Sequence, residues 1–224
     1  MKRYRSLTTF AALAALGLVA LVPAQAQVSF GTGGFGGGSG NVNIGSDQDN
    51  TMSVTANIDN GLDIVNVTSS ELLNSQGIGQ ASFEAVDGLI NNIAIDLDPD
   101  GSLPRVFQRF TANPQDGTGD LSLAIDYVGT TSGTLLLNNV LSLGNGENRF
   151  ELTADAGYYI SKVTVNAPGG FDLFKQIRIL DVSTYDPETH GTGDPSVPEP
   201  GTWALLCGLG VSGTALLRRR AAVK

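Results

Sequence analysis

The chain has 224 residues, with 13 lysines and arginines against 22 aspartates and glutamates, so its formal net charge is −9 at pH 7. Because a negative surface repels phosphate backbones and anionic lipid, the composition disfavours nucleic-acid binding. The chain has one cysteine, Cys207, and one histidine, His190, so it can form no intramolecular disulfide and lacks the usual nitrogen and sulfur ligands of a zinc site.

The N-terminal sequence predicts a secretory signal peptide over residues 1–26. Three basic residues precede an apolar stretch over residues 10–22, and the small-residue sequence Ala24-Gln25-Ala26 follows. A basic start, a short apolar core and an A-x-A site are the parts of a cleavable export signal. We expect cleavage after Ala26. The alternative, an uncleaved anchor, is disfavoured because the apolar core is short for a membrane span.

The next segment, residues 27–50, is rich in glycine, with seven glycines among residues 31–40. Ordering so many glycines costs much backbone entropy, so we predict a flexible leader. A phosphate-binding loop is the alternative interpretation. The Gly-Lys-Ser/Thr sequence of such a loop is missing and no apolar strand precedes the glycines, which argues against it.

Residues 51–184 alternate between apolar and polar side chains, which is the pattern of half-buried strands. The clearest case is residues 121–127, where Leu121, Leu123 and Ile125 alternate with polar or small residues. Similar patterns occur at residues 93–97, 150–152, 159–165 and 177–179. Residues 135–137 are all apolar and predict a strand buried on both faces. Only residues 70–73 suggest a helix. About ten strands at this spacing predict an all-β fold, an antiparallel β-sandwich resembling a jelly roll.

Turn sequences separate the predicted strands. Gly144-Asn145-Gly146 is expected to form a hairpin between residues 140–143 and 149–152, and Asp155-Ala156-Gly157 is expected to close another. Residues 116–119 are expected to begin the strand that contains Leu121.

The densest group of carboxylates is Asp96, Asp98 and Asp100, which are followed by Gly101. On a strand, Asp96 and Asp98 share one face with their Cα atoms about 7 Å apart. The Asp-x-Asp-x-Asp-Gly pattern resembles the opening of an EF-hand loop and predicts a calcium site. At position twelve of this pattern, counted from Asp96, an EF-hand loop has a bidentate glutamate, but this chain has Phe107. The alternative interpretation is a turn between two strands, with the aspartates in solvent.

Other chemistry has little support in the sequence. His190 lies in a predicted linker, residues 185–196, so a Ser-His-Asp or Cys-His mechanism has no suitable imidazole. Paired carboxylates could serve glycoside hydrolysis, but Asp96 and Asp98 lie on an exposed strand face where no raised pKa is expected. We therefore expect no enzyme and assign no catalytic residue.

Sugar binding is a separate possibility that depends on aromatic side chains. Five aromatic residues could form a stacking platform, although most of them are expected in the core: Tyr127, Tyr158, Tyr159, Phe107 and Phe171.

The C-terminal residues 197–224 contain three parts in a fixed order. Pro198-Glu199-Pro200 comes first, a nearly uninterrupted apolar run follows over residues 203–217, and Arg218-Arg219-Arg220 comes last. As a helix the apolar run would be about 22 Å long, short for a hydrocarbon core of roughly 30 Å. The arginines would stay in the cytoplasm by the positive-inside rule, which leaves the preceding domain outside. An ordinary membrane anchor is the alternative.

Together these three parts resemble the PEP-CTERM sorting signal of bacterial exosortase substrates. The resemblance implies that an inner-membrane exosortase recognises the tail, removes it at or near Pro198-Glu199-Pro200, and releases the protein towards the cell surface or the extracellular polymer matrix. Residues 83–88, 143–150 and 174–179 more loosely resemble β-rich domains found ahead of such tails, a likeness that brings no established activity or site residues.

These observations predict an exported protein with a structural or adhesive role in the surface matrix. Its expected partners are the export machinery and the exosortase, the inner membrane during transit, and exopolysaccharide, with no nucleic acid. Without the two signals, six basic residues remain against 21 acidic ones, so the mature domain has a charge near −15. The alternative function is a carbohydrate-binding module or a carbohydrate-active enzyme.

Overall fold

The structure is a computed structural model that describes residues 27–33, 39–59, 61, 63–76, 79–98 and 103–190. The described part of the chain is mostly β-strand with almost no helix, which confirms the all-β prediction. The strands are β1 (Val28–Thr32), β2 (Val42–Ile44), β3 (Gln48–Ile58), β4 (Ile64–Gln76), β5 (Gly79–Gln80), β6 (Ser82–Ala85), β7 (Ile90–Leu97), β8 (Arg105–Val106), β9 (Arg109–Gly117), β10 (Gly119–Gly129), β11 (Gly133–Leu143), β12 (Phe150–Ala154), β13 (Tyr158–Leu180) and β14 (Ser183–Thr184). One short helix, α1 (Pro187–His190), follows them.

Twelve of the strands form one antiparallel sheet whose main path runs β1-β12-β9-β13-β6-β4-β3-β2-β5. Off this path, β10 pairs with β11 and β13, and β7 pairs with β13 and β4. The two remaining strands, β14 and β8, form a small separate sheet.

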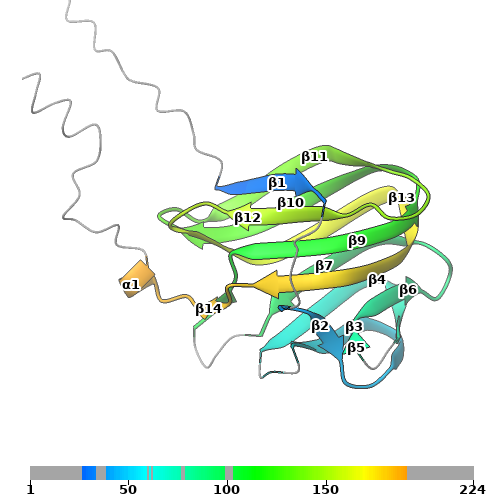
Figure 1. Cartoon of the computed structure of the whole chain (residues 1–224), viewed down its shortest axis with the longest axis horizontal. Helices are drawn as coiled ribbons and strands as arrows, with labels where there is room; N and C mark the ends of the chain where they lie inside the picture. The colour runs from blue at the N-terminus through cyan, green and yellow to red at the C-terminus, as the bar shows by residue number, and fades with distance from the viewer. Residues whose placement is uncertain are drawn as a thin grey trace, which may run out of the picture.

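The sheet folds back on itself because its two long strands, β13 and β4, each belong to two sets of neighbours. The first half of β13 lies between β10 and β7, whereas its second half lies between β9 and β6. In the same way β4 pairs first with β7 and later with β6. Figure 1 shows the resulting two layers, with β12, β9 and the second half of β13 in front of β10 and β7.

The core lies between the layers and follows from the alternation of side chains along each strand. Its largest fully buried side chains include six phenylalanines: Phe83, Phe107, Phe110, Phe150, Phe171 and Phe174. The rings of Phe110 and Phe150 lie 6.0 Å apart and those of Phe171 and Phe174 lie 5.6 Å apart. Two of the five candidate stacking residues, Phe107 and Phe171, are therefore core residues.

The leader prediction for residues 27–50 differs from the structure. Residues 28–32 form β1, which pairs with β12, and residues 42–44 form β2, which pairs with β3 and β5. The apolar side chains of Val28, Val42 and Ile44 are buried, and this burial stabilises the segment. At Gly40 (φ +76°) an added Cβ would lie 2.5 Å from the Ile179 carbonyl oxygen, so a glycine there permits close approach to β13. Residues 34–38 lie outside the described residues.

Two predicted hairpins are also corrected. Gly144-Asn145-Gly146 connects β11 to β12, yet β11 pairs with β10 and β12 pairs with β1 and β9. The turn at Asp155-Ala156-Gly157 likewise joins two strands, β12 and β13, that do not pair with each other in the described part of the chain. Both turns carry the chain from one layer to the other. Turn residues favour a reversal of the chain, but they do not determine which strand becomes the neighbour, so they did not predict these pairings.

Two further strand assignments differ in detail. We predicted residues 135–137 to be buried on both faces, but only one face is covered. Leu135 and Leu137 pack against the core, so Leu136 between them points away from it and is 64% exposed. Residues 70–73 belong to β4 rather than to a helix.

The predicted linker over residues 185–196 begins inside the folded part. Tyr185 is buried, and its hydroxyl donates a hydrogen bond to the Gly129 carbonyl at 3.2 Å. The predicted signal peptide, residues 1–26, and the sorting residues Pro198, Glu199, Pro200, Arg218, Arg219 and Arg220 lie outside the described residues. Within the described residues, no helix is long and apolar enough to cross a membrane.

Candidate functional site

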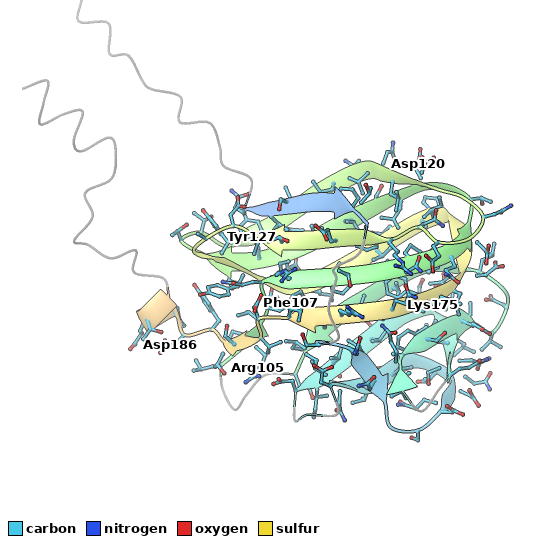
Figure 2. The ribbon with its side chains drawn as sticks, in the orientation of Figure 1. Arg105, Phe107, Asp120, Tyr127, Lys175 and Asp186 are labelled. Atoms are coloured by element: carbon cyan, nitrogen blue, oxygen red, sulfur yellow. The ribbon has the colours of Figure 1, made fainter. Side chains whose placement is uncertain are left out.

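A polar cavity of about 150 Å³ lies on the outer face of the layer formed by β12, β9 and the second half of β13. The strands β9, β13 and β5 supply most of its lining, together with two residues next to β1 and β12. Its lining residues are Gly33, Gln80, Thr111, Ala112, Asn113, Arg149, Gln176 and Arg178. Lys175 is on β13 in this layer, and Figure 2 places it at the opposite end of the molecule from Tyr127.

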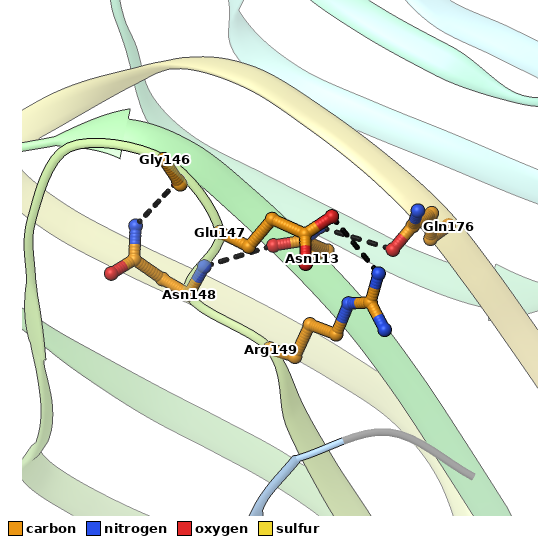
Figure 3. A network of polar contacts seen from close by, with 6 residues as sticks. All are labelled: Asn113, Gly146, Glu147, Asn148, Arg149 and Gln176. Carbon is orange, nitrogen blue, oxygen red and sulfur yellow. Dashed lines mark hydrogen bonds and ion pairs between the residues drawn. The ribbon is translucent and has the colours of Figure 1, made fainter. Parts of the chain in front are cut away.

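Asn113 is the most deeply buried polar residue of the lining, with no exposed surface. Because Phe110 and Ala112 point into the core, Thr111 and Asn113 point to the outer face of β9. The Asn113 amide nitrogen donates to the Gln176 side-chain oxygen at 3.1 Å, and its own oxygen accepts from the Asn148 backbone N–H at 2.9 Å (Figure 3). A buried amide with both groups paired avoids the free-energy cost of an unsatisfied polar group.

The loop that presents Arg149 is held by its own hydrogen bonds. The Asn148 side-chain nitrogen donates to the carbonyl oxygens of Gly144 and Gly146, and the Gly146 N–H donates to Asp116 Oδ1 at 2.7 Å. Arg149 then forms an ion pair with Glu147 at 2.9 Å, and their side chains are 43% and 50% exposed (Figure 3). Such an exposed pair contributes little to stability, so Arg149 can exchange this partner for another.

Gln176 occupies an irregular position on β13. The register between β13 and β9 shifts between residues 175 and 178, and Gln176 has φ of 54°, a left-handed conformation unusual for a residue other than glycine. The bulge turns Gln176 towards Asn113, while Phe174 and Ile177 remain in the core. On the same strand the Arg178 Nε donates to Asn41 Oδ1 at 3.1 Å.

The lining combines two chemical properties. Arg149 and Arg178 carry permanent positive charges and can only donate hydrogen bonds. The amides of Gln80 and Gln176 can both donate and accept, whereas the buried Asn113 amide is already paired within the protein. The lining includes no carboxylate. The cavity is therefore suited to a small polar ligand that has hydroxyl groups and a negative charge.

Comparison with protein-family models found no match to this chain, and comparison with curated proteins found none either.

Sequence reasoning did not find this cavity. It identified no strand at residues 109–117, because Asn113-Pro114-Gln115 breaks the apolar pattern and proline is rare inside a sheet. In the structure Pro114 lies beyond the last residue of β9 that pairs with β12, and its carbonyl accepts from the Asn148 N–H at 3.1 Å. The signal that could have found the strand is the alternation of Phe110 and Ala112 with polar residues.

The predicted calcium residues lie elsewhere, at the end of β7. Asp96 and Asp98 are half-buried opposite the buried Ile95 and Leu97, and the Asn66 side chain donates a hydrogen bond to Asp98. Asp100 lies outside the described residues, and within those residues no group of three or more potential metal-binding side chains occurs. Calcium binding by Asp96, Asp98 and Asp100 stays a prediction.

Asp96 corrects the expectation that neither carboxyl group has a raised pKa. Burial raises the pKa of Asp96 above its ordinary value, and the negative charge of Asp98 acts in the same direction. A hydrogen bond with Asn66 and the positive charge of Lys162 lower this pKa, but burial outweighs them.

The three tyrosines of the predicted stacking platform do not line the cavity. The rings of Tyr127 and Tyr158 form an edge-to-face pair with centroids 5.9 Å apart, and the Thr130 hydroxyl donates to the Tyr158 oxygen at 2.7 Å. Tyr159 packs against Tyr185 at 6.1 Å. Each of the three rings therefore packs against another tyrosine ring.

Proposed function

We propose that this chain is an exported surface or extracellular-matrix protein, processed by an exosortase, with a structural or adhesive role associated with exopolysaccharide. The observation that carries the proposal is the order of Pro198-Glu199-Pro200, a short apolar run and Arg218-Arg219-Arg220 in one tail. A short apolar segment with arginines at its cytoplasmic end holds a domain outside the membrane, where a protease can release it.

The β-rich domain would be the part delivered to the matrix. We propose that it is a β-sandwich of jelly-roll type, and the division of β13 and β4 between two sets of neighbours supports this interpretation. The excess of acidic residues supports solubility outside the cell. We propose no catalytic residue.

Exact-mass analysis of the protein recovered outside the cell tests the processing. We expect a species that begins at Gln27 and ends at or near Pro198-Glu199-Pro200. Material that still carries residues 218–224 outside the cell would contradict the proposal.

Substitution of the tail provides a second test. Replacing all three of Arg218, Arg219 and Arg220 by asparagine removes the cytoplasmic charges. We expect the tail to lose its fixed orientation in the membrane and its removal to fail. Lys175→Gln is the matched control, because it changes a basic residue of the exported domain and should leave the mature mass otherwise unaltered. Normal delivery and processing of the triple variant would overturn the assignment of the tail.

A second candidate function is carbohydrate binding, and the polar cavity favours it. Its amides can bond to sugar hydroxyl groups that both donate and accept hydrogen bonds. This candidate is compatible with the first, because a matrix protein that binds a polysaccharide would be held in the matrix by that contact.

A further inference from the structure

We propose that the cavity between β9, β13 and β5 binds a single acidic sugar unit, with the sugar carboxylate at Arg149 and Arg178 and the sugar hydroxyls at the neighbouring amides. This inference deepens the carbohydrate-binding function proposed above and rests on it. It does not depend on how the protein is exported or processed.

The distribution of charge is the first argument. Residues 27–197 contain only six basic residues against 21 acidic ones. Two of the six, Arg149 and Arg178, line one cavity whose described lining includes no carboxylate. Two carboxylates adjoin it: Glu147, which pairs with Arg149, and Glu151, which lies opposite Thr111. Two more, Arg109 and Lys175, lie on the paired strands β9 and β13. In an acidic domain this local positive charge is the place where an anionic group is stabilised.

The hydrogen-bonding capacity of the lining is the second argument. A simple anion needs only donors, and the two arginines would supply them. The cavity also contains amides, and the Asn113–Gln176 bond engages the Gln176 oxygen. Within the described part of the chain, the Gln176 amide nitrogen donates no hydrogen bond, so it is available to a ligand oxygen. A ligand with hydroxyl groups as well as a carboxylate uses both kinds of group.

The volume of the cavity is the third argument. A space of about 150 Å³ is below the roughly 300–1,000 Å³ of sites for drug-sized ligands. One sugar unit, at the end or on a branch of a polysaccharide, suits this space better than a longer segment of the chain.

Glu147 provides a specific test of the carboxylate position. Its carboxylate now pairs with Arg149, and both side chains are about half exposed. A ligand carboxylate would compete with Glu147 for the same guanidinium group. Removing the Glu147 charge should therefore strengthen binding of an acidic sugar, which a purely structural role of this loop would not do.

The experiment is isothermal titration calorimetry on the full chain in an uncharged polyoxyethylene detergent, which contains no sugar group. The probes are a short oligogalacturonate, its neutral methyl ester and sodium sulfate. We expect the oligogalacturonate to bind, and the methyl ester to bind at least about tenfold more weakly, because the ester cannot form charge-assisted hydrogen bonds. We expect sulfate to bind more weakly than the oligogalacturonate.

Four variants locate the site. Arg178→Gln should weaken oligogalacturonate binding by about tenfold, and Arg149→Gln provides the same test at a half-exposed position if Arg178→Gln fails to fold. Glu147→Gln should strengthen binding by about two- to fivefold, the scale of an exposed ion pair. Lys162→Gln is the charge-matched control, because Lys162 lies on the first half of β13, which pairs with β10 and β7, and it should leave affinity unchanged.

Several outcomes would overturn the inference. Equal affinity for the methyl ester would show that no carboxylate is recognised, and equal affinity for sulfate would show a general anion site. Absence of binding by protein that melts cooperatively would show that the cavity is no sugar site. Each of these results leaves the exact-mass test of processing untouched, so the two proposals fail separately.

Discussion

At the scale of single residues, Asp96 shows how burial and charge compete at one carboxyl group. Its side chain is half-buried on β7, next to Asn66 on β4 and Lys162 on β13. Burial raises its pKa more than the hydrogen bond with Asn66 and the charge of Lys162 lower it. In the folded protein Asp96 therefore holds its proton to a higher pH than it does in the unfolded chain.

This shift predicts a pH-dependent effect of Asp96→Asn, which replaces the carboxyl group with a neutral group of similar size. Below the ordinary pKa of an aspartate, the wild-type group is protonated in both states and the shift stabilises the folded protein fully. As the pH rises through the raised pKa, that contribution is lost, because the unfolded state ionises first. We therefore expect the free energy of unfolding of Asp96→Asn, relative to that of the wild type, to increase between about pH 3 and about pH 7. Urea unfolding at each pH measures this difference.

The exposed Asp172, changed to asparagine, is the control for this measurement. The stability of both variants is compared with that of the wild type at each pH. If the stability of Asp96→Asn instead fell relative to the wild type as the pH rose, attraction to Lys162 would outweigh burial and the assigned direction of the pKa shift would be wrong.

At the scale of the elements, the bend in β13 is the feature that joins the two layers. The register with β7 is interrupted between Asn166 and Phe171, and Gly169 and Gly170 lie in this interval. The Thr118 hydroxyl donates to the Gly169 carbonyl at 3.0 Å, and the Thr118 N–H donates to the Gly170 carbonyl at 3.1 Å. The connection between β9 and β10 is thus held directly against the bend.

This contact predicts that Gly169→Ala destabilises the domain. An added Cβ would lie 2.1 Å from the Thr118 carbonyl oxygen, a backbone atom that cannot move without disturbing the contact. We expect the free energy of unfolding to fall by about 1–3 kcal/mol, measured from urea unfolding curves.

Gly144→Ala is the matched control, since an added Cβ there would meet no atom within 4 Å. Its stability should stay within about 0.5 kcal/mol of the wild type. Equal stability of the two variants would show that the bend in β13 does not require close approach to Thr118.

At the scale of the whole molecule, the acidic excess is the dominant property. The full chain has a net charge of −9, and residues 27–197 alone have 21 acidic against six basic residues. Mutual repulsion of like charges destabilises a compact state more than an expanded one. Within the described residues, ion pairs such as Arg149 with Glu147 and Arg105 with Asp63 offset only part of this repulsion.

We therefore expect the melting temperature of the full chain to rise as sodium chloride increases from about 0.01 M to about 0.1 M. The screening length falls from roughly 30 Å to roughly 10 Å over this range, so repulsion across the molecule decreases. Differential scanning calorimetry at neutral pH measures the effect, and potassium chloride serves as a control for a specific effect of sodium. A melting temperature that falls with either salt would mean that attractive charge pairs dominate.

The amino-acid sequence by itself determined the all-β class of this protein. Side chains of a strand alternate between two faces because of backbone geometry, so a local pattern such as Leu121, Leu123 and Ile125 is enough to predict a strand. The same local rule indicated the opposite faces of Asp96 and Ile95. Composition likewise established the acidic charge and the presence of a single histidine, His190.

Only the tertiary structure decided which strands are neighbours and where the cavity lies. The turn at residues 144–146 reverses the chain, but it joins strands in different layers. Leu136 is exposed because it points away from the core, and no second layer covers that face of β11 in the described structure. Asn113, Arg149 and Gln176 meet through pairings between residues distant in sequence. Such pairings depend on how all the apolar faces are buried together, a property of the whole fold that no local sequence pattern contains.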